Sequence, residues 1–319
     1  MIRMAVLNNL RSGRGAPRVA LVLDLLRSHP EVLHLETETA DSVPEALAQF
    51  EQADAELLVI NGGDGTLQGA LTEILADHER SWCPALAPMR AGRTNMAATD
   101  FGSAHDPVKG LATLIAAARD GSLEQHRVHR PVLRVDLSTQ GGPHYGMFFG
   151  AGMLYRAVQL TSRHLPRGRA QGVFGAGVVT GTLVARTATG RVGGVLEPDK
   201  MQVAIDDDPP ESEELRLVMA TTLRQLFLRL RPFWGREQGP LRFTTIAADA
   251  QHLGRAVWGL ARGRPPVWAT PETGYRSRNC ATVSFRLDCG MTIDGELLPP
   301  DPGRTVTVST DDRIRFFRA

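Results

Sequence analysis

The 319-residue sequence has few cysteines, few aromatic residues and almost no net charge. It contains three cysteines, 6% aromatic residues and a formal net charge of +1. Cys83, Cys280 and Cys289 form no CxxC pair, which argues against a disulfide framework and against a cysteine-based zinc site. Because acidic and basic residues balance, no overall basic field marks a nucleic-acid partner, and we expect none.

Long apolar runs are also missing. The apolar start at residues 1–7 is too short for a signal peptide, and no stretch approaches the roughly 20 residues that span a bilayer. We therefore expect a cytoplasmic protein without a transmembrane segment, which leaves room for a peripheral contact at the inner face of the membrane. The hydrophobic share of 42% and the length favour a globular protein of two domains.

The most informative motif is a glycine-rich turn that follows a short apolar run at residues 57–60. The turn reads Gly62-Gly63-Asp64-Gly65-Thr66, and helical apolar spacing follows it. Strand, glycine turn and helix together form the local architecture that binds phosphate, and glycine lets the backbone approach a ligand closely. An acid in such a turn indicates a nucleotide with a metal, or proton chemistry. The alternative is a tight connection in which Asp64 caps the next helix.

Residues 1–125 alternate between predicted strands and helices. Strands are expected at 4–7, 32–36, 57–60 and 85–87, and helices at 17–28, 44–52 and 107–120. Asp41 or Ser42 would cap the second helix, and Gly121 would end the third. This βαβ rhythm predicts a parallel sheet with helices on both faces.

From about residue 128 the pattern changes to short β segments between turn signals. Strands are expected at 131–137, 145–149, 192–196, 201–205, 215–221, 241–246, 267–270, 282–287 and 305–309, with one helix at about 172–188. Such a series is typical of a β-sandwich. The acidic run at 206–214 is expected to be a solvated loop.

Two further polar glycine turns follow predicted strands of the first half. One runs from Asn8 to Gly15, and the other spans residues 88–98. Because ligands bind at the carboxyl ends of parallel strands, both turns should lie beside Gly62–Thr66. Arg11 and Arg14 could contact phosphates there, or could belong to a solvated basic turn.

These motifs resemble the diacylglycerol kinase catalytic-domain family of bacterial lipid kinases and sphingosine kinases, whose fold is shared with NAD kinases. Gly62–Thr66 matches the family's central motif in full, and Asp294-Gly295-Glu296 matches its Asp-Gly-Glu. The first motif is matched at residues 9–13, with Leu10 in place of Pro, and residues 149–152 resemble a further family turn. The third motif is matched at residues 92–98, where Arg93 and Met96 depart from the family pattern.

The resemblance implies an ATP-dependent kinase with two domains. Residues 1–128, with about 312–319 returning, would form an α/β three-layer nucleotide-binding domain, and residues 129–311 a β-sandwich domain for a lipid substrate. ATP and Mg²⁺ would be the cofactors, with Asp64 holding the metal through Mg-ATP. The implied nucleotide-binding residues are Asn9, Ser12, Gly13, Gly62, Gly63, Gly65, Thr66, Gly92, Arg93, Thr94 and Asn95.

The resemblance also implies the catalytic residues Asp64, Glu296 and Asp294. Glu296 would accept the proton of the attacking lipid hydroxyl, and Asp294 would assist through the metal or by aligning Glu296. The alternative for this motif is a type I′ hairpin that carries an ordinary surface acid. Gln238 stands where family members often carry a Mg²⁺-holding Asp, with Glu237 beside it.

A lipid acceptor at a membrane surface requires an apolar cleft. Its expected lining is Phe148, Phe149, Met153, Leu154, Tyr155, Val173, Phe174, Val178 and Val179. Residues 223–234 combine apolar side chains with three arginines, which suits a membrane-facing rim; core β structure with a basic edge is the alternative. A kinase of a soluble alcohol, as in NAD kinases, and a non-catalytic nucleotide-binding regulator stay open as functions. So does a homodimer.

Overall fold

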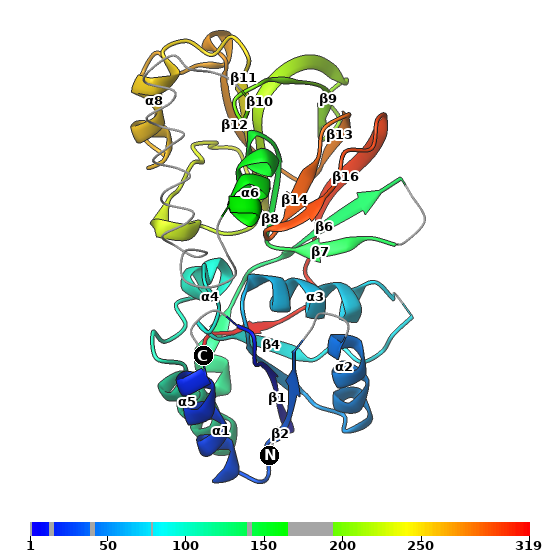
Figure 1. The fold of residues 1–319 in the computed structure, drawn as a ribbon, viewed down its shortest axis with the longest axis vertical. Helices are drawn as coiled ribbons and strands as arrows, with labels where there is room; N and C mark the ends of the chain where they lie inside the picture. Colours follow the sequence, from blue (N-terminus) through cyan, green and yellow to red (C-terminus); the bar gives the residue numbers. More distant parts are fainter. Residues whose placement is uncertain (1, 13–15, 39–41, 78, 139–141, 165–193) are drawn as a thin grey trace. The chain divides into compact units, whose positions relative to one another are not determined.

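The computed structural model describes residues 2–12, 16–38, 42–77, 79–138, 142–164 and 194–319. The chain divides into two compact units, residues Met1–Val132 with Asp311–Ala319 and residues Leu133–Thr310 (Figure 1). The boundaries predicted from the sequence lie after residues 128 and 311. Among the described residues, no helix has the length and apolar character to cross a membrane.

Unit 1 is built on a six-stranded sheet in the order β2-β1-β3-β4-β17-β5. Its strands are β1 (Met4–Asn9), β2 (Leu33–Thr37), β3 (Leu57–Asn61), β4 (Ala85–Pro88), β5 (Arg127–Val128) and β17 (Phe316–Phe317). The neighbours among β1 to β4 all pair in parallel, which confirms the predicted α/β fold. Their carboxyl ends therefore share one edge of the sheet.

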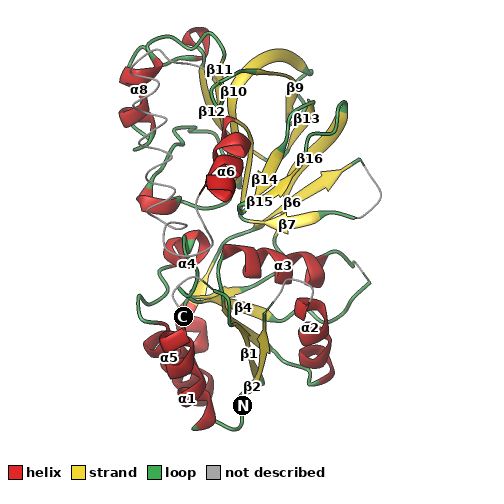
Figure 2. Cartoon of the chain, in the orientation of Figure 1, coloured by secondary structure: helices red, strands yellow, loops and turns green. Residues whose placement is uncertain are grey.

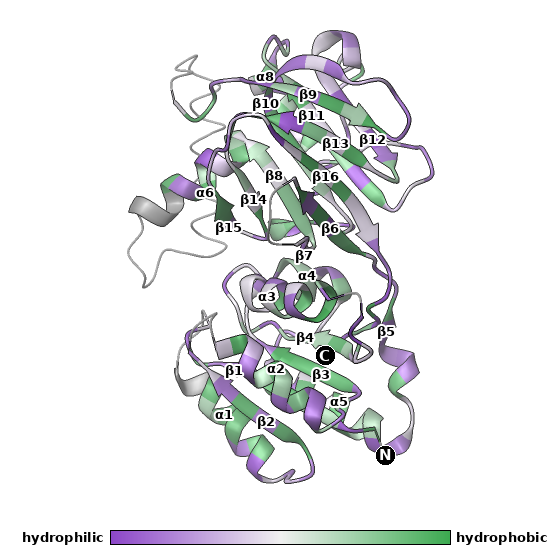
Figure 3. Cartoon of the chain, turned by 90° about the vertical axis from the view of Figure 1, so that its right-hand side faces the viewer, coloured by the Kyte–Doolittle hydropathy of each residue, from purple (hydrophilic) through white to green (hydrophobic). Residues whose placement is uncertain are grey.

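Helices cover both faces of this sheet (Figure 2). They are α1 (Ala16–Arg27), α2 (Val43–Gln52), α3 (Asp64–Leu75), α4 (Met96–Phe101) and α5 (Pro107–Asp120), with a short 3₁₀ turn η2 (Leu123–His126). Every residue of β3 is buried, and β3 is drawn largely in green in Figure 3. Apolar side chains from α1 and α5 pack with those of β1, β3 and β4 in one core cluster. A strand buried on both faces explains the continuous apolar run read from the sequence.

The ends of α5 follow ordinary capping chemistry. The Asp106 side chain accepts the Val108 N–H at the start of α5, Pro107 occupies its first turn, and Gly121 ends it with φ +80° as predicted. Ser42 stands at the N-cap of α2, but its side chain makes no cap hydrogen bond.

The C-terminal residues return to unit 1, as the resemblance implies for residues 313–318. Strand β17 pairs in parallel with β4 and antiparallel with β5. Phe316 is fully buried, and its ring lies 4.8 Å from that of Phe101. The carbonyl of Ala319 accepts the Ala104 N–H. Unit 1 is thus completed by a segment from the far end of the chain.

Unit 2 contains an eleven-stranded antiparallel sheet in the order β15-β14-β8-β10-β9-β13-β16-β6-β7, with β11 on β10 and β12 on β11. The strands are β6 (Val132–Leu137), β7 (His144–Gly146), β8 (Phe148–Gly152), β9 (Asp199–Ile205), β10 (Glu211–Thr221), β11 (Leu241–Ala247), β12 (Tyr275–Cys280), β13 (Val283–Leu287), β14 (Met291–Ile293), β15 (Glu296–Leu298) and β16 (Arg304–Asp311). Phe149, Phe243 and Phe285 meet in its core. The predicted C-terminal β fold is confirmed.

In the described part of unit 2, two helices and two 3₁₀ turns interrupt these strands: α6 (Met153–His164), α8 (Leu253–Leu260), η3 (Phe227–Arg229) and η4 (Pro271–Thr273). The sequence predicts neither of these helices, and it does not predict β12, β14 or β15. Helix α8 is short and contains two glycines, which weakens its helical signal.

Two predicted strands are wrong. Residues 267–270 form turns rather than a strand, because Pro265 and Pro266 supply no N–H group and Val267 is 97% exposed. Residues 194–196 of the strand expected at 192–196 are also turn. In the acidic run, residues 206–210 are a turn as expected, but Glu211 to Glu214 begin β10. The helix expected at 172–188 lies outside the described residues.

Candidate functional site

Three polar turns meet at the carboxyl edge of the unit 1 sheet. They follow β1, β3 and β4, which are neighbours in that sheet. Asn9 Nδ2 donates to Thr66 Oγ1 at 2.8 Å and joins the first turn to the second. Ser12 Oγ donates to the carbonyl of Ala91 at 3.0 Å and joins the first turn to the third. The arrangement expected from strand order is therefore present within unit 1.

The second and third turns approach each other so closely that only glycine fits. A Cβ atom on Gly92 would lie 2.3 Å from the Cα atom of Gly63. A Cβ atom on Gly62 would lie 2.6 Å from the Cβ atom of Thr66. Both distances are far inside van der Waals contact. Gly92 is therefore required for the close approach of the two turns, and Gly62 leaves room for Thr66 within the central turn.

Asp64 is the first residue of α3, but its side chain serves a different helix. Its Oδ2 accepts the Met96 N–H at 3.1 Å and its Oδ1 accepts the Ala97 N–H at 3.2 Å. The interpretation of Asp64 as a cap of the next helix is wrong, because α3 begins at the N-cap Gly63 without a side-chain bond and the carboxylate caps α4. Asp64 thus ties the central turn to the third turn.

The environment of Asp64 acts on its acidity in two opposite directions. Burial raises the pKa of the Asp64 carboxyl, and the backbone N–H groups of Met96, Ala97 and Asn95 oppose that rise. The raised pKa means that desolvation outweighs the hydrogen bonds. A cation next to this carboxylate would offset the free-energy cost of removing its negative charge from water.

Two buried amides at the same edge have atoms without hydrogen-bond partners in the described structure. Asn95 is 4% exposed, has φ +52° and donates from Nδ2 to the Gly92 carbonyl at 2.9 Å, while its Oδ1 lacks a partner. Asn8 accepts from Asn61 Nδ2 at 2.8 Å, while its Nδ2 lacks a partner. Such groups are rare in folded proteins and are explained where a ligand approaches. Sequence reasoning missed Asn8 and Asn61, although an Asn near the end of an apolar strand was a usable signal.

The other predicted nucleotide-binding residues divide into three groups. Gly65 lies in the first turn of α3, and Arg93 and Thr94 are half-buried in the third turn. Arg11 points to solvent and pairs with Glu38 at 3.5 Å. Gly13 and Arg14 lie outside the described residues. A Mg²⁺ ion is usually held by one or two carboxylates together with substrate phosphates, and Asp64 on a glycine-rich turn between a strand and a helix fits that donor set.

The Asp-Gly-Glu motif of unit 2 forms the tight turn between β14 and β15. Asp294 has φ +49° and Gly295 has φ +96°, as the type I′ hairpin alternative predicts. Asp294 is 9% exposed, and its Oδ2 accepts the Met147 N–H at 2.8 Å between β7 and β8. Glu296 is exposed at the start of β15. Asp294 therefore has an architectural contact, while Glu296 is accessible to a ligand.

Gln238, which stands where family members often carry a Mg²⁺-holding Asp, lies in a loop before β11. Glu237 is exposed, and its Oε2 accepts the Asn279 N–H at 3.1 Å. The Asn279 side chain donates to the Glu237 carbonyl at 3.0 Å. Glu237 thus anchors this loop to β12, and Gln238 beside it is exposed.

Unit 2 encloses an apolar cavity of about 170 Å³. It is lined by Phe148, Met153, Leu154, Leu196, Arg216, Leu217, Met219, Leu226, Phe227, Leu230, Pro232, Trp234, Thr244, Ile246, Leu253, Val257, Leu260 and Ala261. Three of the residues predicted for a lipid cleft, Phe148, Met153 and Leu154, are among them. Phe149 instead belongs to the sheet core, and the ring of Tyr155 fills the space beside Gly290. Residues 173–179 lie outside the described part of the chain.

Among the described residues of this lining, the one charged side chain is held by backbone carbonyls. Arg216 donates through Nε to the Ala248 carbonyl at 2.9 Å and through Nη1 to the Leu196 carbonyl at 2.7 Å. Its guanidinium is thus engaged at the cavity wall, and the cavity is suited to a hydrocarbon chain.

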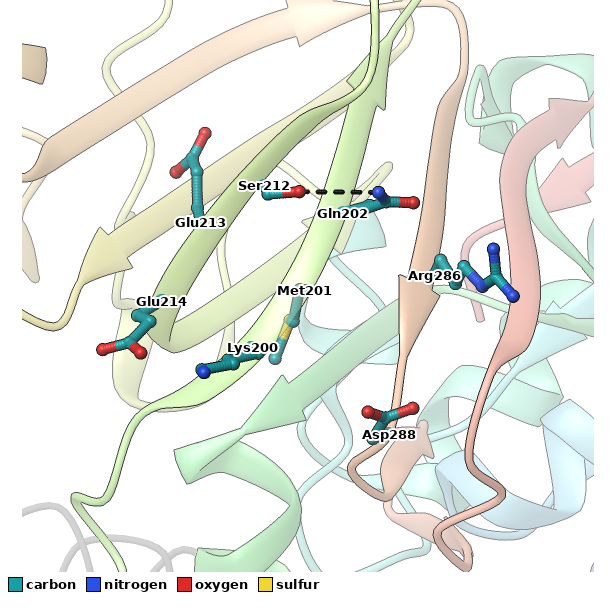
Figure 4. A pocket seen from close by; sticks show the side chains of 8 residues that line it. All are labelled: Lys200, Met201, Gln202, Ser212, Glu213, Glu214, Arg286 and Asp288. Carbon is teal, nitrogen blue, oxygen red and sulfur yellow. Dashed lines mark hydrogen bonds between the residues drawn. The ribbon is translucent and has the colours of Figure 1, made fainter.

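A second hollow of unit 2 is polar and has about 520 Å³ of space (Figure 4). It combines Lys200 and Arg286 with Glu213, Glu214 and Asp288. The Asp288 carboxylate accepts the Gly303 N–H at 2.7 Å, and Glu213 pairs with Arg276 at 2.8 Å. No residue predicted for the site lines this hollow, so the larger volume does not mark the chemistry.

The N-terminal part of the chain matches a model of a known protein family. Residues 3–124 match the model described as the diacylglycerol kinase catalytic domain. The resemblance to that family is confirmed. The matched residues lie within unit 1 and include all three polar turns. No curated protein sequence matches the chain.

Solved structures extend the likeness to both units. A putative diacylglycerol kinase from Bacillus anthracis str. Sterne superposes with a TM-score of 0.69 at 14% identity, covering 99% of this chain and 95% of that one. A second diacylglycerol kinase structure from the same strain gives 0.63 at 15% identity, covering 99% and 97%. Yeast NADH kinase complexed with NADH gives 0.52 at 11% identity, covering 100% and 84%. These likenesses show that both units together have the fold of diacylglycerol kinases and NAD kinases.

Proposed function

We propose that the protein is an ATP-dependent lipid kinase that transfers the γ-phosphoryl group to a hydroxyl of a diacylglycerol-like or sphingoid lipid. The observation that carries the lipid assignment is the cavity of unit 2, whose lining by described residues is apolar apart from Arg216 and Thr244. A soluble alcohol has no use for such a cavity, whereas an acyl or alkyl chain gains free energy by burial there. The acceptor would reach the protein as a peripheral partner at a membrane surface.

The three turns of unit 1 are assigned to the nucleotide. Backbone N–H groups of the glycine turn at the start of α3, with the side chains of Asn9, Ser12 and Thr66, would bind the phosphates. The Arg93 guanidinium of the third turn would add a charge-assisted contact. Bound Mg²⁺ would neutralise phosphate charge, and Asp64 would hold it through Mg-ATP.

The chemical step needs one proton acceptor. The oxygen of the lipid hydroxyl attacks the γ-phosphorus, the bond to the oxygen between the β- and γ-phosphorus breaks, and ADP leaves. The exposed Glu296 carboxylate would accept the hydroxyl proton, and Asp294 would fix the turn that presents it.

A kinase of a soluble dinucleotide is the second candidate, favoured by the likeness to yeast NADH kinase over the whole chain. A nucleotide-binding regulator without transfer is the third. Neither explains the apolar cavity.

The test is a transfer assay with γ-labelled ATP and Mg²⁺. Separate reactions contain diacylglycerol or sphingosine in detergent micelles, NAD, or no acceptor. We expect label in the lipid fraction. Label in NAD alone supports the second candidate, and nucleotide binding without label in any acceptor supports the third. An Asp64→Asn sample serves as the control for transfer that depends on this site.

A further inference from the structure

Two segments of unit 2 carry arginines and no acidic residue. Residues 223–236 contain Arg224, Arg229, Arg231 and Arg236, and residues 250–271 contain Arg255, Arg262 and Arg264. The sequence predicts a membrane-facing rim for most of the first segment but does not connect it with the second. A protein with a net charge of +1 has concentrated positive charge in these two places.

The structure packs the two segments together. The Arg231 N–H donates to the Ala261 carbonyl at 2.8 Å. A Cβ atom on Gly263 would lie 2.7 Å from the Arg231 carbonyl oxygen, so the backbones are in contact. Both segments also line the apolar cavity, through Phe227 and Leu230 in one and Val257 and Leu260 in the other. They therefore form one continuous rim at the apolar cavity, which we call the basic rim.

Large apolar side chains on the basic rim are exposed to solvent. Leu228 is 51% exposed, Trp258 on α8 is 65% exposed and Val267 is 97% exposed. Only three other large apolar side chains of the described residues are classed as exposed. The Arg262 guanidinium lies 3.9 Å from the centre of the Trp258 ring, a cation–π contact that holds a charge beside an aromatic group.

The backbone of the rim also favours exposure of Leu228. Leu228 and Arg229 have φ +54° and +59°, in the left-handed region that residues other than glycine rarely adopt. Packing does not explain this conformation, because both side chains are exposed. The strain is explained if Leu228 is presented to a partner.

We infer that the basic rim docks on an anionic lipid bilayer. Arg229, Arg231, Arg255, Arg262 and Arg264 are exposed and form no ion pair with a described residue, so the rim attracts a partner of negative charge. Exposed Trp, Leu and Val beside them select a surface with an apolar interior over a soluble polyanion. The inference rests on the proposed function, because a lipid acceptor would enter the cavity from the docked membrane.

Sedimentation with vesicles tests the basic rim without ATP and without an acceptor. The full chain is mixed with vesicles of phosphatidylcholine alone or with 30% phosphatidylglycerol. We expect binding to the mixed vesicles that falls with added salt and is weak on phosphatidylcholine alone. The double variant Arg262→Gln with Arg264→Gln should bind about 25-fold more weakly, since each arginine near an anionic surface contributes about fivefold.

Matched variants separate this rim from general surface effects. Trp258→Ala should weaken binding to the mixed vesicles, whereas Leu21→Ala, an exposed apolar residue of unit 1, should not. Arg286→Gln, an exposed arginine of β13, is the charge control. Equal binding to both vesicle types, or equal binding by the rim variants and the wild-type chain, would overturn the inference. The inference would also be overturned if the chain bound RNA tightly but did not bind vesicles, or if it dimerised through the basic rim.

Vesicle binding by the basic rim can be distinguished from phosphoryl transfer. Vesicle binding without phosphoryl transfer would reject the proposed function and leave the basic rim in place. Transfer to micellar lipid with no vesicle binding would reject the basic rim and leave the kinase in place.

Discussion

Two Asp-Gly turns, one in each unit, use the same chemistry for different ends. Asp64 opens α3 and accepts the N–H groups of Met96 and Ala97, which begin another helix. Asp294 sits in the turn between β14 and β15 and accepts the N–H of Met147, which lies between two strands. In each case a carboxylate on a glycine turn fixes a neighbouring segment by a bond to its backbone.

The two turns differ in which acid remains accessible. At the unit 1 turn, Asp64 is half-buried and the same residue is predicted to meet the nucleotide and its metal. At the unit 2 turn, the roles are separate, because Asp294 is buried and Glu296 is exposed. The two acids of the Asp-Gly-Glu motif therefore differ in burial, and mutations can distinguish the two arrangements.

The largest expected effect is at Asp64. Asp64→Ala should abolish transfer and also lower stability by about 1 kcal/mol, because α4 loses its cap. Asp64→Asn retains an oxygen for one of the two N–H groups and loses the charge, so it should reduce transfer about 1000-fold with little change in melting temperature. Transfer assays and thermal unfolding measure both. Full activity in either variant contradicts the mechanism.

At the unit 2 turn, the effects on rate and on stability should separate. Glu296→Gln should lower turnover by roughly 100- to 10,000-fold while ATP binding and melting temperature persist, because an exposed general base is removed. Asp294→Ala should cost about 1–3 kcal/mol of unfolding free energy, because the Met147 N–H loses its acceptor. Steady-state kinetics, calorimetric ATP titration and urea unfolding provide the readouts. Unchanged turnover in Glu296→Gln would remove Glu296 as the base.

The close approach of the turns gives a smaller effect, tested by a pair of glycines. Gly92→Ala should destabilise the chain by about 1–3 kcal/mol and weaken ATP binding, because its Cβ atom would lie 2.3 Å from the Gly63 Cα atom. Gly69→Ala is the control within α3, where nothing lies within 4 Å of the new atom. It should raise stability by roughly 0.5–1 kcal/mol. Equal stability of the two variants would contradict the packing of the turns.

The smallest effect is the pH dependence at Asp64. Its pKa is raised by burial, so the folded chain binds the Asp64 proton more tightly than the unfolded chain. Stability from this group is therefore present at low pH and is lost as pH rises through the raised pKa. Asp64→Asn lacks this loss, so its unfolding free energy relative to wild type should increase from pH 4 toward neutrality without nucleotide or metal. A difference that stays constant over this range would show that Asp64 titrates as in the unfolded chain.

The sequence predicted unit 1 more completely than unit 2, for a physical reason. Strands β1, β3 and β4 are buried on both faces and appear as continuous apolar runs, and the helices between them show the apolar spacing of a helix. In unit 2, short strands such as β14 and β15 have three residues each. Three residues are too few for alternation to be recognised, and the pairing partners lie far apart in sequence.

The candidate site shows the same division. The glycine turns were recognisable because local backbone freedom is encoded by residue type. The contacts of their side chains were not, because Asp64 reaches helix α4, 32 residues ahead, rather than its own helix. Likewise, Asn8 and Asn61 meet only because β1 and β3 pair in parallel with these two residues opposite each other.

The sequence by itself determined the motifs, the order of β1 to β4 and of the helices between them, and the family resemblance, since these depend on residue type and local spacing. Tertiary structure alone decided that Asp64 caps α4, that Asp294 anchors Met147 and that residues 223–236 and 250–271 form one rim. Those outcomes require hydrogen bonds and packing between segments distant in sequence. No local pattern specifies which distant backbone groups will supply the partners.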